Sequence, residues 1–188
     1  MNFFKKSLSS KFYIFIFGII LGSFLSVTFL NHYINVEILR PEPTQGKLKS
    51  YSLTHDNLDR TYDVFVPDSL KKNAPVFFIF HGSYGTSAGM RGATGFDFEY
   101  LAQEKGFLVV YPQGYKNFWN DCRGSADYEA NLKDVDDIGY YKKVINLIEK
   151  DFGINKNNII STGISNGGHM VYKLAYEIPN STFLHAPL

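Results

Sequence analysis

The stretch NNIISTGISNGGHMVY, residues 157–172, decides the fold of this chain. Residues 159–162 predict a short buried strand, and the apolar residues from Met170 to Leu174 continue with helical spacing. Between them, residues 163–167 (Gly-Ile-Ser-Asn-Gly) match the G-x-S-x-G pattern of a nucleophile elbow. We therefore predict a strand, a sharp turn and a helix, with Ser165 at the tip of the turn.

The residue types in this turn agree with its geometry. A serine at the tip is held in a strained backbone conformation that lifts its hydroxyl clear of the sheet. Side chains at positions 163 and 167 would collide in so tight a turn, so glycine suits both. The backbone N–H of Asn166, at the positive end of the new helix, then faces the place where an oxyanion forms. The alternative is a glycine-rich turn in an ordinary α/β domain, and the flanking strand and helix favour the nucleophile.

Length and composition exclude several classes of function. The 188 residues allow one domain with an appendage, and the net charge of +1 gives no electrostatic basis for binding nucleic acid. No Cys/His cluster has the spacing of metal ligands, and we expect neither a metal nor another cofactor. The single cysteine, Cys122, cannot form an internal disulfide.

The N-terminal segment has the pattern of an export signal. Lys5, Lys6 and Lys11 precede a run without charge, residues 12–30, which as a helix would span about 28 Å, close to the ~30 Å hydrocarbon core of a bilayer. This charge asymmetry predicts that the N-terminus stays in the cytoplasm and that the rest of the chain is extracytoplasmic, membrane-anchored or secreted. Residues 1–30 are then either a cleaved signal peptide or an uncleaved anchor. We favour the anchor because no clear A-x-A cleavage site follows the apolar run.

Residues 31–47 contain two prolines and Gly46 and predict a linker, after which residues 48–188 alternate between predicted strands and helices. Two half-buried strands join around Asp56-Asn57. The other predicted strands are 76–80, 107–111, 159–162 and 182–186, and the predicted helices are 96–105, 134–152 and the segment after the elbow. This order predicts an α/β fold with a mostly parallel sheet flanked by helices.

Two connecting segments carry further candidates. The strand at 76–80 ends in His81-Gly82-Ser83, and a glycine-rich loop at the carboxyl end of a strand is where an α/β sheet binds ligands. We expect His81 to hold this loop by hydrogen bonds and not to act as a base. The long irregular stretch 115–133 contains Trp119, which either lines a substrate pocket or plugs the loop onto the core. The aspartates at positions 134, 136 and 137 are expected to cap the helix that follows.

Several motifs, taken in order, resemble one family. They are residues 60–62 (RTY), 65–67 (FVP), 81–83 (HGS), 111–114 (YPQG), 119–120 (WN), 135–139 (VDDIG) and 163–168 (GISNGG). This set, spread over roughly residues 48–187, is similar to the α/β-hydrolase family of polyhydroxybutyrate depolymerases and related feruloyl and acetylxylan esterases. The resemblance implies a secreted serine esterase that acts on a polyester or on an ester-decorated plant polysaccharide. It also implies that Ser165 is the nucleophile and that the amides of Asn166 and Ser83 form the oxyanion hole.

The chain departs from this pattern after the nucleophile. Triad partners in this fold follow the serine in the order Ser, Asp or Glu, His. After Ser165 there is no Asp, and the candidates are Glu177 in a helix, His169 one turn past the nucleophile and His185 inside the last predicted strand. We assign none of them to the triad. The last strands of the family, with their Asp and His loops, are therefore predicted to be missing, and the remaining sheet edge would be prone to aggregation.

Two functions of different classes follow from these observations. The first is an exported carboxylic-ester hydrolase that acts on an ester polymer or oligomer, weak or inactive in this truncated form because a serine without a base is a poor nucleophile. The second is a non-catalytic remnant or a membrane-anchored binding module that keeps the pocket without turnover. An acyltransferase with the same elbow is a third possibility that no residue excludes.

Overall fold

The computed structural model describes residue 13 and the ranges 15–29, 40–181 and 184–188. The chain divides into two units, Met1–Arg40 and Pro41–Leu188. In the first unit residues 15–29 are helical, but no described helix has both the length and the apolar character that crossing a bilayer requires. The membrane-spanning segment predicted at residues 12–30 is thus not supported by the structure, and its residues 12, 14 and 30 lie outside the described part.

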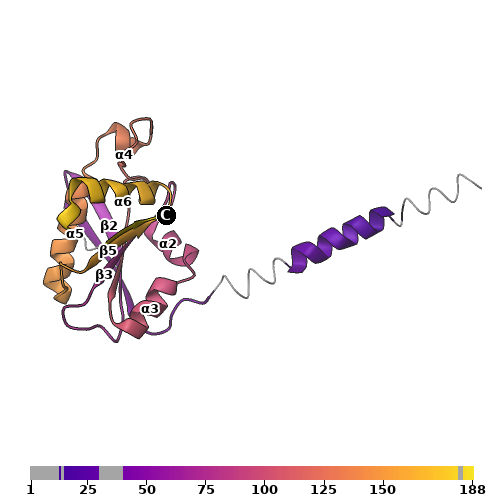
Figure 1. Ribbon diagram of the computed structural model, residues 1–188, viewed down its shortest axis with the longest axis horizontal. Coiled ribbons are helices and arrows are strands. Elements are labelled where there is room, and N and C mark those ends of the chain that lie inside the picture. Colours follow the sequence, from indigo (N-terminus) through magenta and orange to yellow (C-terminus); the bar gives the residue numbers. More distant parts are fainter. Residues whose placement is uncertain (1–12, 14, 30–39, 182–183) are drawn as a thin grey trace, which may run out of the picture. The chain divides into compact units, whose positions relative to one another are not determined.

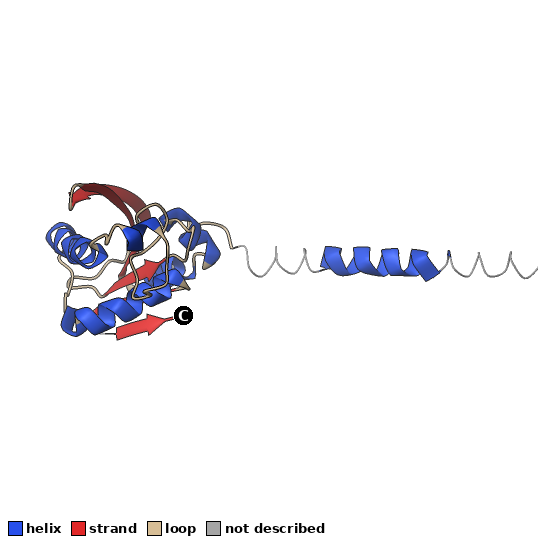
Figure 2. Cartoon of the chain, turned by 90° about the horizontal axis from the view of Figure 1, so that it is seen from above, coloured by secondary structure: helices blue, strands red, loops and turns tan. Residues whose placement is uncertain are grey.

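A six-stranded sheet runs through the described residues of the second unit (Figures 1 and 2). Its strands lie in the order β1-β2-β4-β3-β5-β6. They span β1 Lys47–His55, β2 Leu58–Val66, β3 Val76–Phe80, β4 Leu108–Pro112, β5 Ile159–Gly163 and β6 Leu184–Pro187. β4, β3, β5 and β6 are parallel, whereas β1 and β2 are antiparallel to their neighbours. The predicted mostly parallel sheet is confirmed. Residues 182 and 183 of the last predicted strand lie outside the described residues.

Helices cover both faces of this sheet (Figure 1). They are α2 Ser87–Ala93, α3 Asp97–Lys105, α4 Glu129–Leu132, α5 Asp137–Phe152 and α6 Asn166–Glu177, with a short 3-10 helix at Pro179–Ser181. Successive side chains of β3 point to opposite faces of the sheet, which accounts for the two layers of helices. Phe78 and Phe80 pack against α5 and α6, while Ile79 belongs to a second apolar cluster that includes residues of α2 and α3. The carboxyl ends of the parallel strands are therefore left for loops, including the turn at Ser165.

Local chemistry accounts for the element boundaries. The predicted hairpin around Asp56-Asn57 is confirmed, and both residues have positive φ (50° and 58°), as a tight two-residue turn requires. The helix predicted from residue 134 begins instead at Asp137, because Asp136 is its N-cap and its carboxylate accepts a hydrogen bond from the Gly139 N–H at 2.8 Å. Of the three aspartates predicted at this helix start, Asp136 is the N-cap, Asp137 lies in the first turn, and Asp134 precedes the helix. The short helices α2 and α4 were not predicted.

A buried ion pair joins the start of α5 to the antiparallel part of the sheet. Asp137 accepts a hydrogen bond from the Arg60 guanidinium at 2.6 Å, and both side chains are almost fully buried. Burial raises the pKa of the Asp137 carboxyl, and the Arg60 charge opposes that rise. The other Asp137 oxygen accepts from the Asn120 N–H at 2.7 Å. Asp137 therefore also holds the long loop after β4, at Asn120.

Candidate active site

Ser165 lies at the tip of the turn between β5 and α6, in an unusual backbone conformation. Its φ of 54° and ψ of −119° lie outside the helix and strand regions, and the residue is exposed. A Cβ on Gly163 would lie 2.7 Å from the Gly167 backbone, and one on Gly167 would lie 2.5 Å from the carbonyl oxygens of Phe80 and His81. The turn therefore admits only glycine at these positions, as predicted, and it presents the Ser165 side chain outward.

The loop after β3 passes directly beside this serine. A Cβ placed on Gly82 would lie 3.5 Å from the Cβ of Ser165, so the predicted glycine-rich loop and the turn lie next to each other. Asn166 is the first residue of α6, so its N–H lies at the positive end of the helix. Among the described residues, neither this N–H nor that of Ser83 has a hydrogen-bond acceptor. Two free amides thus flank Ser165, and their role as oxyanion donors stays a prediction.

His81 has the supporting role that we predicted. Its Nδ1–H donates to the Gly82 carbonyl at 2.8 Å, and its Nε2 accepts from the Gly114 N–H at 2.9 Å. With both nitrogens engaged, and with burial lowering its pKa, this imidazole stays neutral and is not available as a base. The structure distinguishes the two predicted roles of Trp119. Its side chain is fully buried, and its Nε1–H donates to the His81 carbonyl at 2.9 Å. Trp119 therefore packs the loop onto the core, which is the second of the two predicted roles.

The described histidines offer no base to the Ser165 hydroxyl. His169 Nδ1 donates to the backbone carbonyl of Ser165 at 2.9 Å and not to its Oγ. His185 lies in β6 beside Ser161, with both ring nitrogens buried and without a hydrogen-bond partner in the described part of the chain. Burial lowers its pKa, so this ring is neutral as well. Among the described residues, the hydroxyl of Ser165 itself has no hydrogen-bond partner.

The loop between β4 and α5 contributes residues that the sequence did not single out. Asp121 is buried and accepts a hydrogen bond from the side-chain amide of Asn166 at 2.6 Å. Tyr128, from the same loop, accepts one from the Ser83 hydroxyl at 3.1 Å. Because Asn166 and Ser83 carry the two free amides, this loop contacts both sides of the candidate site. Only the length of the loop had indicated a functional role.

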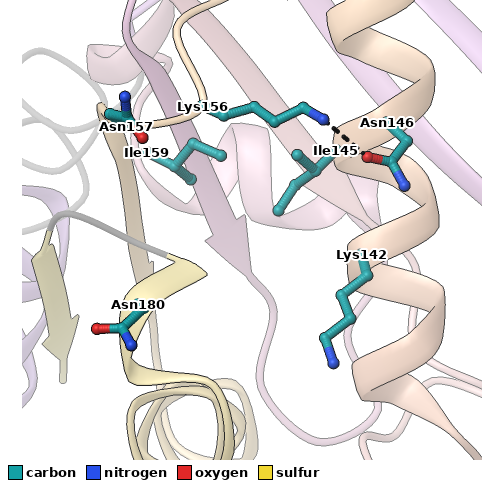
Figure 3. A pocket seen from close by; sticks show the side chains of 7 residues that line it. All are labelled: Lys142, Ile145, Asn146, Lys156, Asn157, Ile159 and Asn180. Atoms are coloured by element: carbon teal, nitrogen blue, oxygen red, sulfur yellow. Dashed lines mark hydrogen bonds between the residues drawn. The ribbon is translucent and has the colours of Figure 1, made fainter.

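Two of the cavities in the described part of the chain lie away from Ser165. One, of about 440 Å³, is lined by Lys142, Ile145, Asn146, Lys156, Asn157, Ile159 and Asn180 (Figure 3). It lies at the start of β5, whereas Ser165 follows the other end of that strand. The second, of about 420 Å³, lies between the long loop and the Lys173 and Glu177 side chains of α6. Neither is lined by Ser165. No three His, Cys, Asp or Glu side chains of the described residues are grouped as metal ligands would be.

Comparison with known proteins places this arrangement among esterases. No protein-family profile matches the chain. It is 26% identical over 128 residues to the bifunctional acetylxylan esterase/xylanase of Neocallimastix patriciarum, covering 68% of this chain and 17% of that protein. It is 26% identical over 148 residues to acetylxylan esterase A of Emericella nidulans, covering 75% of this chain and 46% of that protein. Feruloyl esterase B of Thermothelomyces thermophilus is 27% identical over 119 residues, 62% of this chain and 39% of that protein.

Solved structures agree. A ferulic acid esterase from the anaerobic fungus Anaeromyces mucronatus superposes with a TM-score of 0.61 at 16% identity, over 80% of this chain and 63% of that one. An acetyl xylan esterase from Aspergillus awamori gives 0.59 at 22% identity, over 73% of this chain and 49% of that one. The chain is similar in sequence to esterases and shares their fold. It spans less than half the length of each of the three sequence relatives, between 17% and 46%.

Proposed function

We propose that this α/β-hydrolase is a serine carboxylic-ester hydrolase with Ser165 as its nucleophile. The observation that supports this most is the backbone of Ser165, with φ of 54° between two crowded glycines, because such strain persists where it serves a site. Ser165 would attack the ester carbonyl. The free amides of Asn166 and Ser83 would then stabilise the negative charge that develops on the carbonyl oxygen.

We further propose that the ester belongs to a polymer, either a polyester of the polyhydroxybutyrate type or an ester-decorated polysaccharide. The names of the three sequence relatives favour the polysaccharide. The surface beside Ser83 agrees with a large substrate. Tyr84 is 79% exposed and packs edge-on against Phe118 at 4.7 Å, and Phe118 stacks on Tyr128 at 4.3 Å. Exposed aromatic faces of this kind hold flat or cyclic groups by area burial.

A binding module without turnover is the second candidate. It is favoured by one observation, namely that no described imidazole reaches the Ser165 hydroxyl. Both candidates keep the aromatic surface and the free amides, and they differ in whether Ser165 forms a covalent bond.

Reaction of the protein with a fluorophosphonate probe distinguishes them. We expect slow but selective labelling of Ser165, because the strained turn exposes its hydroxyl beside two amides that stabilise the phosphonyl oxygen. Mass spectrometry of tryptic peptides locates the label. Ser165→Ala should abolish it, and Ser52→Ala, which removes an exposed serine on β1, should not. Labelling that survives Ser165→Ala would contradict the assignment and favour the binding module.

We also propose that the chain is exported, which the three lysines before the uncharged run of residues 12–30 support. Protease added to cells with a permeable outer layer should digest the region after Asn31 and leave a cytosolic marker intact. The size of the mature chain shows whether residues 1–30 are cleaved or retained. Deletion of residues 12–30 is the matched control and should protect the chain. Full protection of the native chain, with recovery in the cytosolic fraction, would show that it is not exported.

A further inference from the structure

The side chains of both candidate oxyanion donors turn toward one loop, residues 119–128. The Asn166 side chain is fully buried, and its Oδ1 accepts from the Trp119 N–H at 2.8 Å. Its Nδ2 donates to the Trp119 carbonyl at 3.1 Å and to Asp121 Oδ2 at 2.6 Å. On the other side, the Ser83 hydroxyl donates to Tyr128 Oη at 3.1 Å. One loop therefore contacts the two residues whose amides flank Ser165.

Arg123 joins the two ends of this loop. Its Nε donates to Asp121 Oδ2 at 2.8 Å and its backbone N–H donates to Asp121 Oδ1 at 3.0 Å, while its guanidinium lies 5.3 Å from the centre of the Tyr128 ring. Burial pushes the pKa of Asp121 upward, but the hydrogen bonds from Arg123 and Asn166 outweigh it and hold that pKa below its usual range. Asp121 is thus a carboxylate at neutral pH, and its bond to Asn166 is charge-assisted.

The candidate oxyanion hole needs such support because one of its halves lies in a glycine-rich loop and not in a helix or strand. Gly82 and Gly85 flank Ser83, and Tyr84 has a positive φ of 61°. An oxyanion donor acts only when it lies about 2.7–3.1 Å from the charged oxygen. The half at Asn166 is held by α6, whereas the Ser83 half is tied to the 119–128 loop by the hydrogen bond from its own hydroxyl to Tyr128.

We propose that Asp121 and Tyr128 are positioning residues that set the distance between the Asn166 and Ser83 amides, and that Arg123 couples them. Neither residue touches the reacting atoms; Asp121 acts through Asn166 and Tyr128 acts through Ser83. This inference rests on the proposed function at Ser165. It extends that function by assigning the long loop a role in forming the oxyanion hole, so that a change in the loop alters reactivity at a serine it does not contact.

Tyr128→Phe tests the proposal because it removes one hydroxyl and keeps the ring that stacks on Phe118. Tyr172→Phe is the matched control, since Tyr172 is 60% exposed on α6 and has no hydrogen bond among the described residues. For the whole protein reacting with a fluorophosphonate, we expect Tyr128→Phe to lower the maximal labelling rate of Ser165 about tenfold. This is less than the ~10²-fold or more lost when a donor is removed outright. The probe concentration at half-maximal rate and the melting temperature should stay as in the control.

A second measurement keeps the two proposals separate. In ¹⁵N–¹H spectra of the same proteins, Tyr128→Phe should shift the Ser83 amide signal, and Asp121→Asn should shift that of Asn166, while Tyr172→Phe should move neither. If Ser165 of the native chain does not react at all, the proposed function fails. The amide signals still test whether the 119–128 loop positions Ser83 and Asn166. Unmoved amide signals, or a labelling rate for Tyr128→Phe within twofold of the control, would overturn the positioning role. A lowered melting temperature with unchanged labelling would assign the loop to stability alone.

Discussion

The 188-residue chain should hydrolyse short p-nitrophenyl esters at least ~10³-fold more slowly than a serine esterase with a complete Ser-His-Asp triad. The reason is that no described histidine is placed to act as a base for the Ser165 hydroxyl. The ring of His169 is turned to a backbone carbonyl, and both nitrogens of His81 are engaged, one with the Gly82 carbonyl after β3 and one with the Gly114 N–H after β4. A serine hydroxyl keeps its proton near neutral pH unless an adjacent general base, most often an imidazole, removes it. Any hydrolysis faster than that in water would then come only from substrate binding and from the two free amides.

Loss of folding must be separated from loss of chemistry in this measurement. β6 is an edge strand of the described sheet, and an exposed edge favours association of chains, so the sample has to be monodisperse. Ser165→Ala gives the blank rate. Turnover by the folded chain within tenfold of an intact esterase would mean that a base exists which the described residues do not reveal. His169 and His185 would then be replaced in turn to find it.

The second large effect concerns stability. Asp137→Ala should lower the free energy of unfolding by about 3–5 kcal/mol, because it leaves the Arg60 charge buried without its partner. It also removes the acceptor for the Asn120 N–H. The adjacent Asp136→Ala is the matched control. Its carboxylate is half exposed and caps the helix, so its loss should cost about 1 kcal/mol.

Chemical denaturation monitored by circular dichroism gives both values. Replacing the pair together, as Arg60→Met with Asp137→Leu, should recover most of the loss, since no unpaired charge then remains. Equal losses for Asp137→Ala and Asp136→Ala would show that the buried pair contributes nothing beyond an exposed cap. The same denaturation followed by tryptophan fluorescence reports on the 119–128 loop, because Trp119, the single tryptophan, lies in it.

The turn at Ser165 could be predicted from sequence because its causes are local. Gly163 and Gly167 are required by atoms within a few residues or on the adjacent strand end, and the apolar run of residues 159–162 indicates the strand without further context. The same holds for β3 and for the hairpin at Asp56-Asn57, where composition alone indicates the structure. The supporting role expected for His81 is also confirmed by its hydrogen bonds to Gly82 and Gly114.

The long loop could not be predicted, because its shape depends on contacts between distant residues. Asp137 resembles a helix cap in sequence, yet its partner Arg60 lies 77 positions away. The hydrogen bonds from Asn166 to Asp121 and from Ser83 to Tyr128 span 45 residues each. Trp119 was equally consistent with a pocket and with the core, and only the position of His81 decided between them. Side-chain type does not reveal such pairings.

The crowding of glycines around Ser165 limits how this site can be diversified by directed evolution. Gly163, Gly167 and Gly168 each have backbone atoms within 3 Å of the space a side chain would fill, so a library randomised there would return glycine. Ile164, the first of the two variable positions of the G-x-S-x-G pattern, is half exposed, and Tyr84 is more exposed still. Ile164 directly precedes Ser165, and Tyr84 directly follows Ser83, the two residues proposed to act on the ester. New substrate preferences would therefore be sought at these two positions, where a mutation leaves the framework of the turn intact.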